Sequence, residues 1–276
     1  MTELERINNL LKENGLVAKK SFGQNFLIND GIIKRIVNGM DIDKYETIIE
    51  IGPGLASLTL PLSKKAKKLV AVDADRDMVA ILKDIFHDND NVTIIQSDFL
   101  RFNPDEYSRK EDRVFIGNLP YNITSELFEY MLEKDFVLAG AMVQKEVADK
   151  LMYVKGKKEN CPLGAFLTAR GEVTLLTNVD SSCFNPAPKV DSAFIRIDKK
   201  RDVDFALYPI FKAIFKDPNK TISNCLKQSP KFASTLSVLK EENNPCLALR
   251  ARQMDIEDII SLTKHIKEIK DSQVEE

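Results

Sequence analysis

Residues 114–121, VFIGNLPY, join a short apolar run to an amide, a proline and an aromatic ring. The apolar run predicts a buried β-strand, and residues 125–132 predict a helix with Thr124 or Ser125 as its N-cap. The tetrapeptide 118–121 is therefore expected where a strand ends and a helix begins. In an open α/β sheet this is the edge at which ligands bind.

The four residues of this junction offer a specific chemistry. Asn118 carries both an acceptor and a donor. Pro120 fixes its own φ, and so helps to turn the carbonyl of Leu119 outward beside the Asn118 amide. Tyr121 adds a flat ring. Two converging acceptors beside a ring suit a planar group with an exocyclic amine, such as adenine. A purely structural junction, with an Asn turn and a core Tyr, remains an open alternative.

Composition predicts an ordinary globular protein. The 276 residues, 43% apolar and 30% charged, are enough for one large domain and one small one. No apolar run is long enough for a membrane span, and the N-terminus lacks the features of a signal peptide, so we expect a cytoplasmic protein without a membrane partner. Two histidines and no CxxC pair predict free thiols and no metal site; the four cysteines are Cys161, Cys183, Cys225 and Cys246.

Charge is unevenly distributed along the chain. Residues 141–240 carry 17 Lys/Arg and 10 Asp/Glu, a net charge of +7. Residues 1–140 carry a net charge of −5, and residues 241–276 carry a net charge of −4. A basic middle between acidic ends is typical of a surface that binds a phosphate backbone, although uneven solvated charge explains it as well.

Three more strand-and-turn steps precede the junction. Apolar runs at 47–51, 69–73 and 92–96 predict strands, the first of them buried, so the four strands together predict a doubly wound α/β sheet with helices on both faces. The turn 52–57, GPGLAS, has Ser57 where a third glycine of a dinucleotide fingerprint would be. This favours a single nucleoside over a dinucleotide.

A glycine or an acid follows each of these strands. Gly52 lets the backbone approach a ligand closely. Asp73, 21 residues later, is placed to take two ribose hydroxyls, while Asp75 and Asp77 are expected to begin the next helix. Asp98 can accept from an adenine amine, or it can simply cap a turn.

Both ends of the chain are expected to be helical. Residues 4–14 and 30–39 have helical spacing, and between them the polar and aromatic loop 19–27 either covers the ligand or serves as a structural arm. Two strands within 173–197 are expected to form an antiparallel edge of the sheet, before a charged linker at 199–202. Beyond it we predict helices and no strand, at 205–215, 221–228, 232–239 and 256–267.

The chain resembles the ribosomal RNA adenine dimethyltransferase family. The matching segments run in order along nearly the whole chain and are specific in combination: FGQNFL (22–27), EIGPGLASLT (50–59), VDAD (72–75), SDFL (97–100), NLPYNIT (118–124), MVQKEVADKL (142–151), FNPAPKVDSAFIRI (184–197) and RARQMDIEDI (250–259). The NLPY, VQKEVADKL and PAPKVDSA segments resemble the small-subunit enzymes more than the large-subunit resistance enzymes.

The resemblance implies a class I methyltransferase that uses S-adenosylmethionine. It implies a catalytic domain over residues 1–200, with an N-terminal arm at 1–29, and a helical RNA-binding domain over 201–276. The implied cofactor-binding residues are Asn25, Leu27, Gly52, Asp73, Asp98 and Asn118. Residues 118–121 would form the catalytic site, with Tyr121 and Phe184 stacking on the flipped adenine.

Two positions depart from the family pattern. Asp73 replaces the usual Glu, which is a mild change for a hydroxyl acceptor, and Asn219 lies where the family has Arg or Lys. This second departure leaves an RNA contact there in doubt.

The implied activity is methylation of two adjacent adenosines in small-subunit ribosomal RNA, free or in an assembling subunit, by a monomer. Other classes remain open: a large-subunit RNA methyltransferase, a methyltransferase acting on DNA or protein amines, and a non-catalytic RNA-binding assembly factor.

Overall fold

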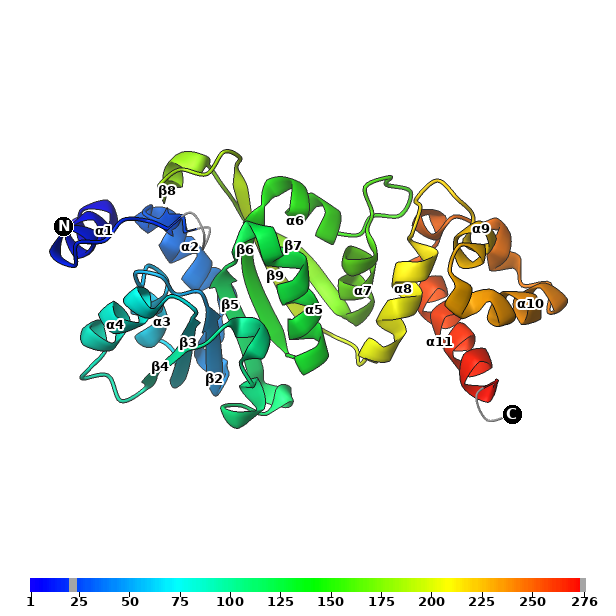
Figure 1. The fold of residues 1–276 in the computed structure, drawn as a ribbon, viewed down its shortest axis with the longest axis horizontal. Coiled ribbons are helices and arrows are strands. Elements are labelled where there is room, and N and C mark those ends of the chain that lie inside the picture. Colours follow the sequence, from blue (N-terminus) through cyan, green and yellow to red (C-terminus); the bar gives the residue numbers. More distant parts are fainter. Residues whose placement is uncertain (20–23, 274–276) are drawn as a thin grey trace. The chain divides into compact units, whose positions relative to one another are not determined.

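The computed structural model describes residues 1–19 and 24–273 (Figure 1). The chain forms two compact units. The first comprises Met1–Ala148 and Thr174–Asp198, and the second comprises Asp149–Val173 and Lys199–Glu276. Phe22 and Gly23 of the FGQNFL segment lie outside the described residues.

A seven-stranded sheet, visible in Figure 1, has the strand order β4-β3-β2-β5-β6-β9-β7. The first five strands in this order are parallel, and β9 runs antiparallel to β6. The strands are β2 (Thr47–Ile51), β3 (Lys68–Asp73), β4 (Val92–Gln96), β5 (Arg113–Asn118), β6 (Leu138–Gln144), β7 (Gly171–Val179) and β9 (Ser192–Lys199). The four predicted strands and the antiparallel β9 are confirmed.

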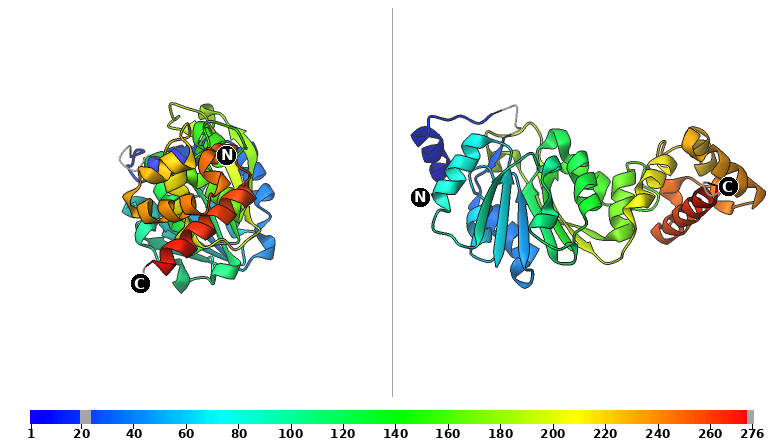
Figure 2. Two further views of the ribbon diagram at one scale, coloured as in Figure 1. Left: turned by 90° about the vertical axis from the view of Figure 1, so that its right-hand side faces the viewer. Right: turned by 60° about the horizontal axis from the view of Figure 1, so that its bottom comes forward.

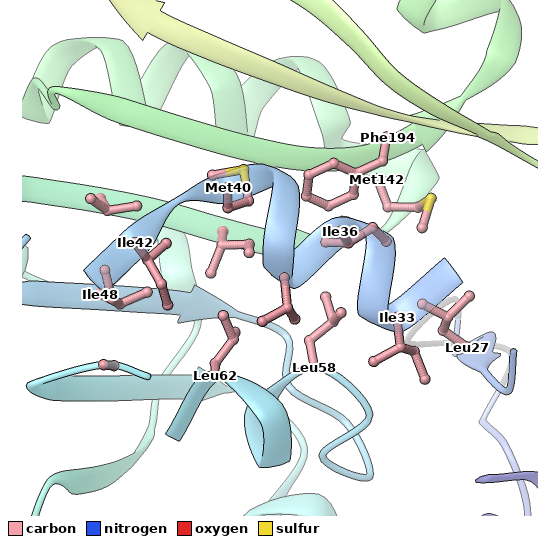
Figure 3. Packing of buried hydrophobic residues seen from close by; sticks show 14 of the residues in the cluster. Leu27, Ile33, Ile36, Met40, Ile42, Ile48, Leu58, Leu62, Met142 and Phe194 are labelled. Carbon is pink, nitrogen blue, oxygen red and sulfur yellow. The ribbon is translucent and has the colours of Figure 1, made fainter. Parts of the chain in front are cut away.

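Helices cover both faces of this sheet, as predicted for a doubly wound fold. Figure 3 shows Ile33, Ile36 and Met40 of α2 (Asp30–Met40) packed against strand and helix residues that include Ile48 of β2. On the opposite face, Phe115 of β5 meets the ring of Phe99, which in turn contacts Tyr130 of α5 (Thr124–Lys134). Alternate side chains of β5 are thus buried on opposite faces, which explains its continuous apolar sequence.

The start of α5 differs from the prediction. A 3-10 turn, Tyr121–Ile123, leads directly into the helix, so the N-cap position falls on Ile123, which makes no side-chain cap bond. Thr124 is already helical, and its hydroxyl donates to Pro120 O at 3.1 Å. The prediction of Thr124 or Ser125 as N-cap was therefore wrong, because the turn replaces the cap.

The N-terminal helix α1 (Glu3–Glu13) begins with a capping box between Thr2 and Glu5. It buries Ile7 in a small apolar cluster with Phe26, Leu55 and Met78. The chain then reaches β1 (Phe26–Leu27), which pairs antiparallel with β8 (Phe184–Asn185) in a separate two-stranded sheet. The N-terminal arm therefore pairs with a segment far along the sequence.

The remaining helices of the first unit connect the strands of the large sheet. They are α3 (Thr59–Ser63), α4 (Arg76–Ile85) and most of α6 (Lys145–Leu151). Asp75 caps α4 by accepting from the N–H of Asp77 at 3.0 Å, as the sequence predicted. Among the described residues no helix is long and apolar enough to cross a membrane.

The second unit contains helices and can be followed from green to red in Figure 2. Its helices are α7 (Pro162–Arg170), α8 (Tyr208–Ile214), α9 (Ile222–Lys227), α10 (Ala233–Glu241) and α11 (Ile256–Ser272). Phe166 of α7 packs edge-on against Phe211 of α8. Because α7 belongs with the C-terminal helices, this unit takes in residues 149–173, which differs from the expected boundary after residue 200.

Candidate active site

A cavity in the first unit opens where strands β2, β3, β4 and β5 end. The predicted site residues Asn25, Leu27, Gly52, Asp73, Asp98, Asn118, Leu119, Pro120 and Tyr121 all line it. Parallel strands end at the same edge of a sheet, which is why residues so far apart in the sequence meet here. Phe184 does not line this cavity.

The glycine turn after β2 brings backbone to the cavity. Gly52 has φ +65° and Gly54 has φ +55°, conformations that L side chains rarely adopt. Gly52 N–H donates to Val72 O at 2.9 Å, which fixes the turn against the neighbouring strand. Gly54 N–H donates to Asp73 Oδ2 at 3.1 Å. The positive φ angles explain why glycine occupies both positions of this turn.

Asp73 is the last residue of β3 and is 9% exposed. Its Oδ1 accepts from the N–H of Asp75 at 2.8 Å, and its Oδ2 accepts from the N–H of Gly54. Burial raises the pKa of Asp73, while these backbone donors oppose the rise. A carboxylate has about four lone-pair sites, so two adjacent hydroxyls can still be accepted.

Asp98 follows β4, where it caps a turn and also lines the cavity. Its Oδ1 caps a 3-10 turn by accepting from Leu100 N–H at 3.0 Å. The side chain is 52% exposed and lines the cavity. The capping bond occupies only part of the acceptor capacity of the carboxylate, which leaves oxygen lone pairs for a ligand amine.

Asn118 connects the end of β5 to the N-terminal arm. Its Nδ2 donates to Asn25 O at 2.9 Å, across 93 positions of the chain. This bond commits the donor side of the amide to the arm and leaves Oδ1 as the acceptor. Pro120, with φ −58°, and the buried Leu119 follow it, and Leu119 N–H donates to Met142 O at 3.2 Å. The junction is thus held rigidly to the neighbouring strand β6.

Ion pairs hold the arm beside the cavity. Lys19 Nζ contacts Asp75 Oδ1 at 2.7 Å and Asp77 Oδ2 at 2.6 Å. Gln24 Nε2 donates to the second oxygen of Asp75 at 2.8 Å. Burial opposes ionisation of Asp75, but hydrogen bonds from Lys19, Asp77 N–H and Gln24 together keep its pKa below the usual value. Sequence reasoning assigned no partner to Lys19.

Glu50 is a further cavity residue that sequence reasoning missed. It lies on β2, is 1% exposed and lines the cavity. Neither its Oε2 nor the nearby Thr59 hydroxyl has a hydrogen-bond partner within the described part of the chain. Burial raises the pKa of Glu50 to about 8, and the nearby Asp73 carboxylate adds to the rise. The signal was available, since an acid within the apolar run 47–51 is unusual for a buried strand.

The two rings predicted to stack on a base are placed differently. Tyr121 is partly buried and lines the cavity. Phe184 is 3% exposed and belongs to the apolar core cluster that includes Leu27 and Phe194. A ring buried to this degree offers no free face to a base, so the prediction for Phe184 is corrected for this conformation: it packs in the core.

The chemistry of the lining fits S-adenosylmethionine. This molecule carries an ammonium, two ribose hydroxyls, an adenine amine and a cationic sulfur, all of which interact well with acceptors. The cavity presents the carboxyls of Glu50, Asp73 and Asp98 and the Asn118 oxygen. An unpartnered, buried carboxyl oxygen is costly unless a ligand donates to it, and Glu50 Oε2 is such an atom. Over residues 1–19 and 24–273, no group of three or more His, Cys, Asp or Glu side chains gathers to hold a metal ion.

Comparison with known proteins identifies a family that matches most of the chain. A model of the family described as ribosomal RNA adenine dimethylase matches residues 15–264. A relative from Metamycoplasma arthritidis, named ribosomal RNA small subunit methyltransferase A, is 39% identical over 253 residues, which cover 90% of this chain and 95% of the relative. A protein of the same name from Bacillus licheniformis is 31% identical over 281 residues, covering 96% of each chain.

Two solved structures share the fold. A dimethyladenosine transferase from Plasmodium falciparum has a TM-score of 0.73 at 24% identity, covering 88% of this chain and 98% of its own. The 23S rRNA methyltransferase ErmE has a TM-score of 0.64 at 23% identity, covering 90% of this chain and 100% of its own. The fold is therefore that of a class I methyltransferase. With the family match and the two relatives above 30% identity, the chain belongs to the ribosomal RNA adenine dimethylase family, enzymes that methylate ribosomal RNA adenine with S-adenosylmethionine as methyl donor.

Proposed function

We propose that this enzyme dimethylates the exocyclic amine of two adjacent adenosines in small-subunit ribosomal RNA during ribosome biogenesis. The observation that carries the proposal is the acceptor-lined cavity, which Asn118 and Tyr121 line together with the proposed cofactor residues. The names of the relatives from Metamycoplasma arthritidis and Bacillus licheniformis favour the small subunit. The similarity to the large-subunit enzyme ErmE, at 23% identity, supports the fold alone.

We assign each part of the cofactor to residues at a different strand end. We assign the ribose hydroxyls to Asp73, the adenine amine to Asp98, and the methionine part to the backbone at Gly52. Asn25 and Leu27 would close the cavity from the arm, by backbone and side chain. In support, these five residues line one cavity although they come from four separate segments of the chain.

The methyl transfer itself needs a better nucleophile than a resting adenine amine, whose lone pair is delocalised into the ring. S-adenosylmethionine supplies, when bound, a methyl group on a positively charged sulfur. Asn118 Oδ1 and the Leu119 carbonyl would each accept one hydrogen of the amine, which favours a tetrahedral nitrogen with a localised lone pair. The same acceptors stabilise the positive charge that develops on that nitrogen, and the charged amine then loses a proton readily.

The bond between Asn118 and Asn25 supports this role for Asn118. Because Nδ2 donates to Asn25 O, the amide is held with Oδ1 as its free acceptor. Tyr121 is the ring we assign to stacking on the flipped adenine. Phe184 would need to leave the core to take part, so we do not assign it a contact with the base.

We assign RNA binding to the second unit, in which hydrogen bonds hold three loops together. Arg252 connects three of them: its Nη1 donates to Gly156 O at 2.9 Å and its Nε donates to Pro218 O at 2.9 Å. The neighbouring Arg250 donates from Nε to Asn219 O at 2.8 Å. Loops 155–158, 217–220 and 250–253 therefore form one basic cluster; its cations are Lys155, Lys157, Lys158, Lys220, Arg250 and Arg252.

Such a cluster is suited to contacts with phosphate, which position RNA without reading its sequence. Lys155 forms an exposed ion pair with Asp255 at 2.6 Å. A pair of this kind contributes little to stability and can exchange its acid for a phosphate. We further propose that the enzyme acts as a monomer in the cytoplasm, on an assembling small subunit or its free RNA.

The test compares four substrates: naked small-subunit RNA, assembling small subunits, large-subunit RNA and DNA. Digestion to nucleosides and mass spectrometry would measure dimethyladenosine in each. We expect it in small-subunit RNA at two adjacent positions, and its absence from that RNA in cells that lack the protein. Methylation of large-subunit RNA or DNA instead would overturn the proposed substrate. Tight RNA binding without any methylation would indicate an assembly factor.

A further inference from the structure

The hydroxyl of Tyr121 has a defined partner that the reaction scheme does not use. Tyr121 Oη lies 2.6 Å from Ser192 Oγ, a short hydrogen bond across 71 positions of the chain. Ser192 is 0% exposed, whereas Tyr121 is only partly buried and lines the cavity. The bond therefore runs from the protein interior to a ring at the cavity wall.

The antiparallel direction of β9 explains how Ser192 reaches this place. Ser192 is the first residue of β9 and pairs in register with Gln144, the last residue of β6. A strand that runs antiparallel begins at the edge where its parallel neighbours end. The first residue of β9 thus lies at the same edge as the carboxyl end of β5, from which Tyr121 follows after two residues.

Both ends of the Tyr121 side chain are consequently attached to the same sheet. Its backbone follows β5, and its hydroxyl is bonded to β9. Burial raises the pKa of Tyr121, with the Ser192 bond opposing the rise, so the phenol stays protonated at neutral pH and can donate. A side chain fixed at both ends cannot move between the staggered positions about its Cα–Cβ bond.

We propose that Ser192 is a positioning residue that holds the Tyr121 ring in the one orientation in which a flipped adenine can stack on it. The inference rests on the proposed role of Tyr121 and adds a second residue to it. Ser192 acts through the phenol and touches neither base nor cofactor. A hydrogen bond that merely satisfies two buried groups would contribute to stability and leave the orientation of the ring unchanged.

The test uses Ser192→Ala, Tyr121→Phe and the double variant. Ser63→Ala is the matched control, because Ser63 is also buried and donates from Oγ to a backbone carbonyl, Leu60 O, at 2.9 Å. The value of kcat/KM for small-subunit RNA should fall about three- to tenfold in Ser192→Ala and in Tyr121→Phe. This is the range expected for the loss of one hydrogen bond between neutral groups. The double variant should lose no more than either single variant, and calorimetry should show unchanged affinity for S-adenosylhomocysteine.

A readout independent of methylation separates this inference from the proposed function. Three-bond NMR couplings of Tyr121 report the rotamer about Cα–Cβ: they should indicate one rotamer in the native protein and averaging in Ser192→Ala. A single rotamer in Ser192→Ala, or losses that multiply in the double variant, would overturn the positioning role. Absence of methylation by the native enzyme would refute the proposed function instead, while the couplings still decide whether Ser192 fixes the ring.

Discussion

Replacing Glu50 by Gln should stabilise the ligand-free protein, and more so as pH rises. Glu50 is 1% exposed in the wall of the cavity, and burial raises its pKa from 4.5 to about 8. The folded protein therefore holds this carboxyl protonated at pH 7, whereas the unfolded chain has it ionised. Gln imitates the protonated form in size and charge and does not titrate.

The sign and size of this effect on the free energy of unfolding follow from proton linkage. Between pH 4.5 and about 8 the folded state binds one more proton than the unfolded state, so each unit of pH lowers the free energy of unfolding by about 1.4 kcal/mol. The loss is absent below pH 4.5 and reaches roughly 5 kcal/mol above pH 8, where Glu50 is ionised in both states. The Gln variant lacks this loss, so its advantage should grow across the same window.

Urea unfolding of the ligand-free protein at pH 5, 6, 7, 8 and 9 measures this difference. The control is Glu46→Gln, a change of the same kind at an exposed residue just before the same strand. We expect the curves for the native protein and Glu50→Gln to diverge with pH, and the control to follow the native curve. A constant offset between native protein and Glu50→Gln at every pH would refute the reasoning, because it would show that Glu50 titrates alike in both states.

Four other outcomes are expected. Asn118→Ala should reduce the single-turnover methylation rate about a hundredfold or more, by loss of one preorganised acceptor, with little change in Tm; a near-native rate would exclude the role. Asp73→Ala should weaken S-adenosylhomocysteine binding by about 1.5–3 kcal/mol in calorimetry, and unchanged affinity would reject the ribose assignment. Lys19→Met should weaken the same binding about fivefold by releasing the arm, while Lys44→Met, which breaks an exposed Lys–Asp pair elsewhere, should not; equal effects would argue against the arm. Neutral substitutions of the lysines in loop 155–158 should make the plot of log affinity against log salt shallower, by about 0.7–0.9 for each phosphate that the protein no longer neutralises, and an unchanged slope in filter binding would remove the loop from the interface.

Four of the five parallel strands could be predicted because each appears in the sequence as a largely apolar run, and all four runs, from 47–51 to 114–117, became strands of the sheet. Strands β2, β3 and β5 are almost wholly buried, which explains their apolar sequences, whereas β4 is only partly buried. The fifth parallel strand, β6, was not predicted, although it is also buried. The polar residues that follow the predicted strands could also be placed. Asp73 and Asn118 lie at the cavity because strand order, once parallel, fixes which ends meet.

Contacts between distant segments could not be predicted in this way. The bond from Tyr121 to Ser192 depends on the direction of β9 and on its register with β6, which no local pattern encodes. Phe184 illustrates the converse: an aromatic residue before a proline-rich loop has the same local sequence whether it faces a ligand or the core. The unit boundary was missed because α7 joins the C-terminal helices through tertiary packing alone.

The pairing of β1 with β8 has a consequence for the order in which the protein matures. Residues 26–27 leave the ribosome early, but their partners 184–185 are made about 160 residues later, which at 5–20 residues per second takes roughly 8–30 s. During synthesis the arm has no strand to pair with, and Ile28 N–H lacks the carbonyl of Cys183 to which it donates at 2.8 Å. The strand β1 is thus paired only after most of the large sheet has been made, whereas the rest of the arm contacts residues made much earlier, such as Asp75 and Met78.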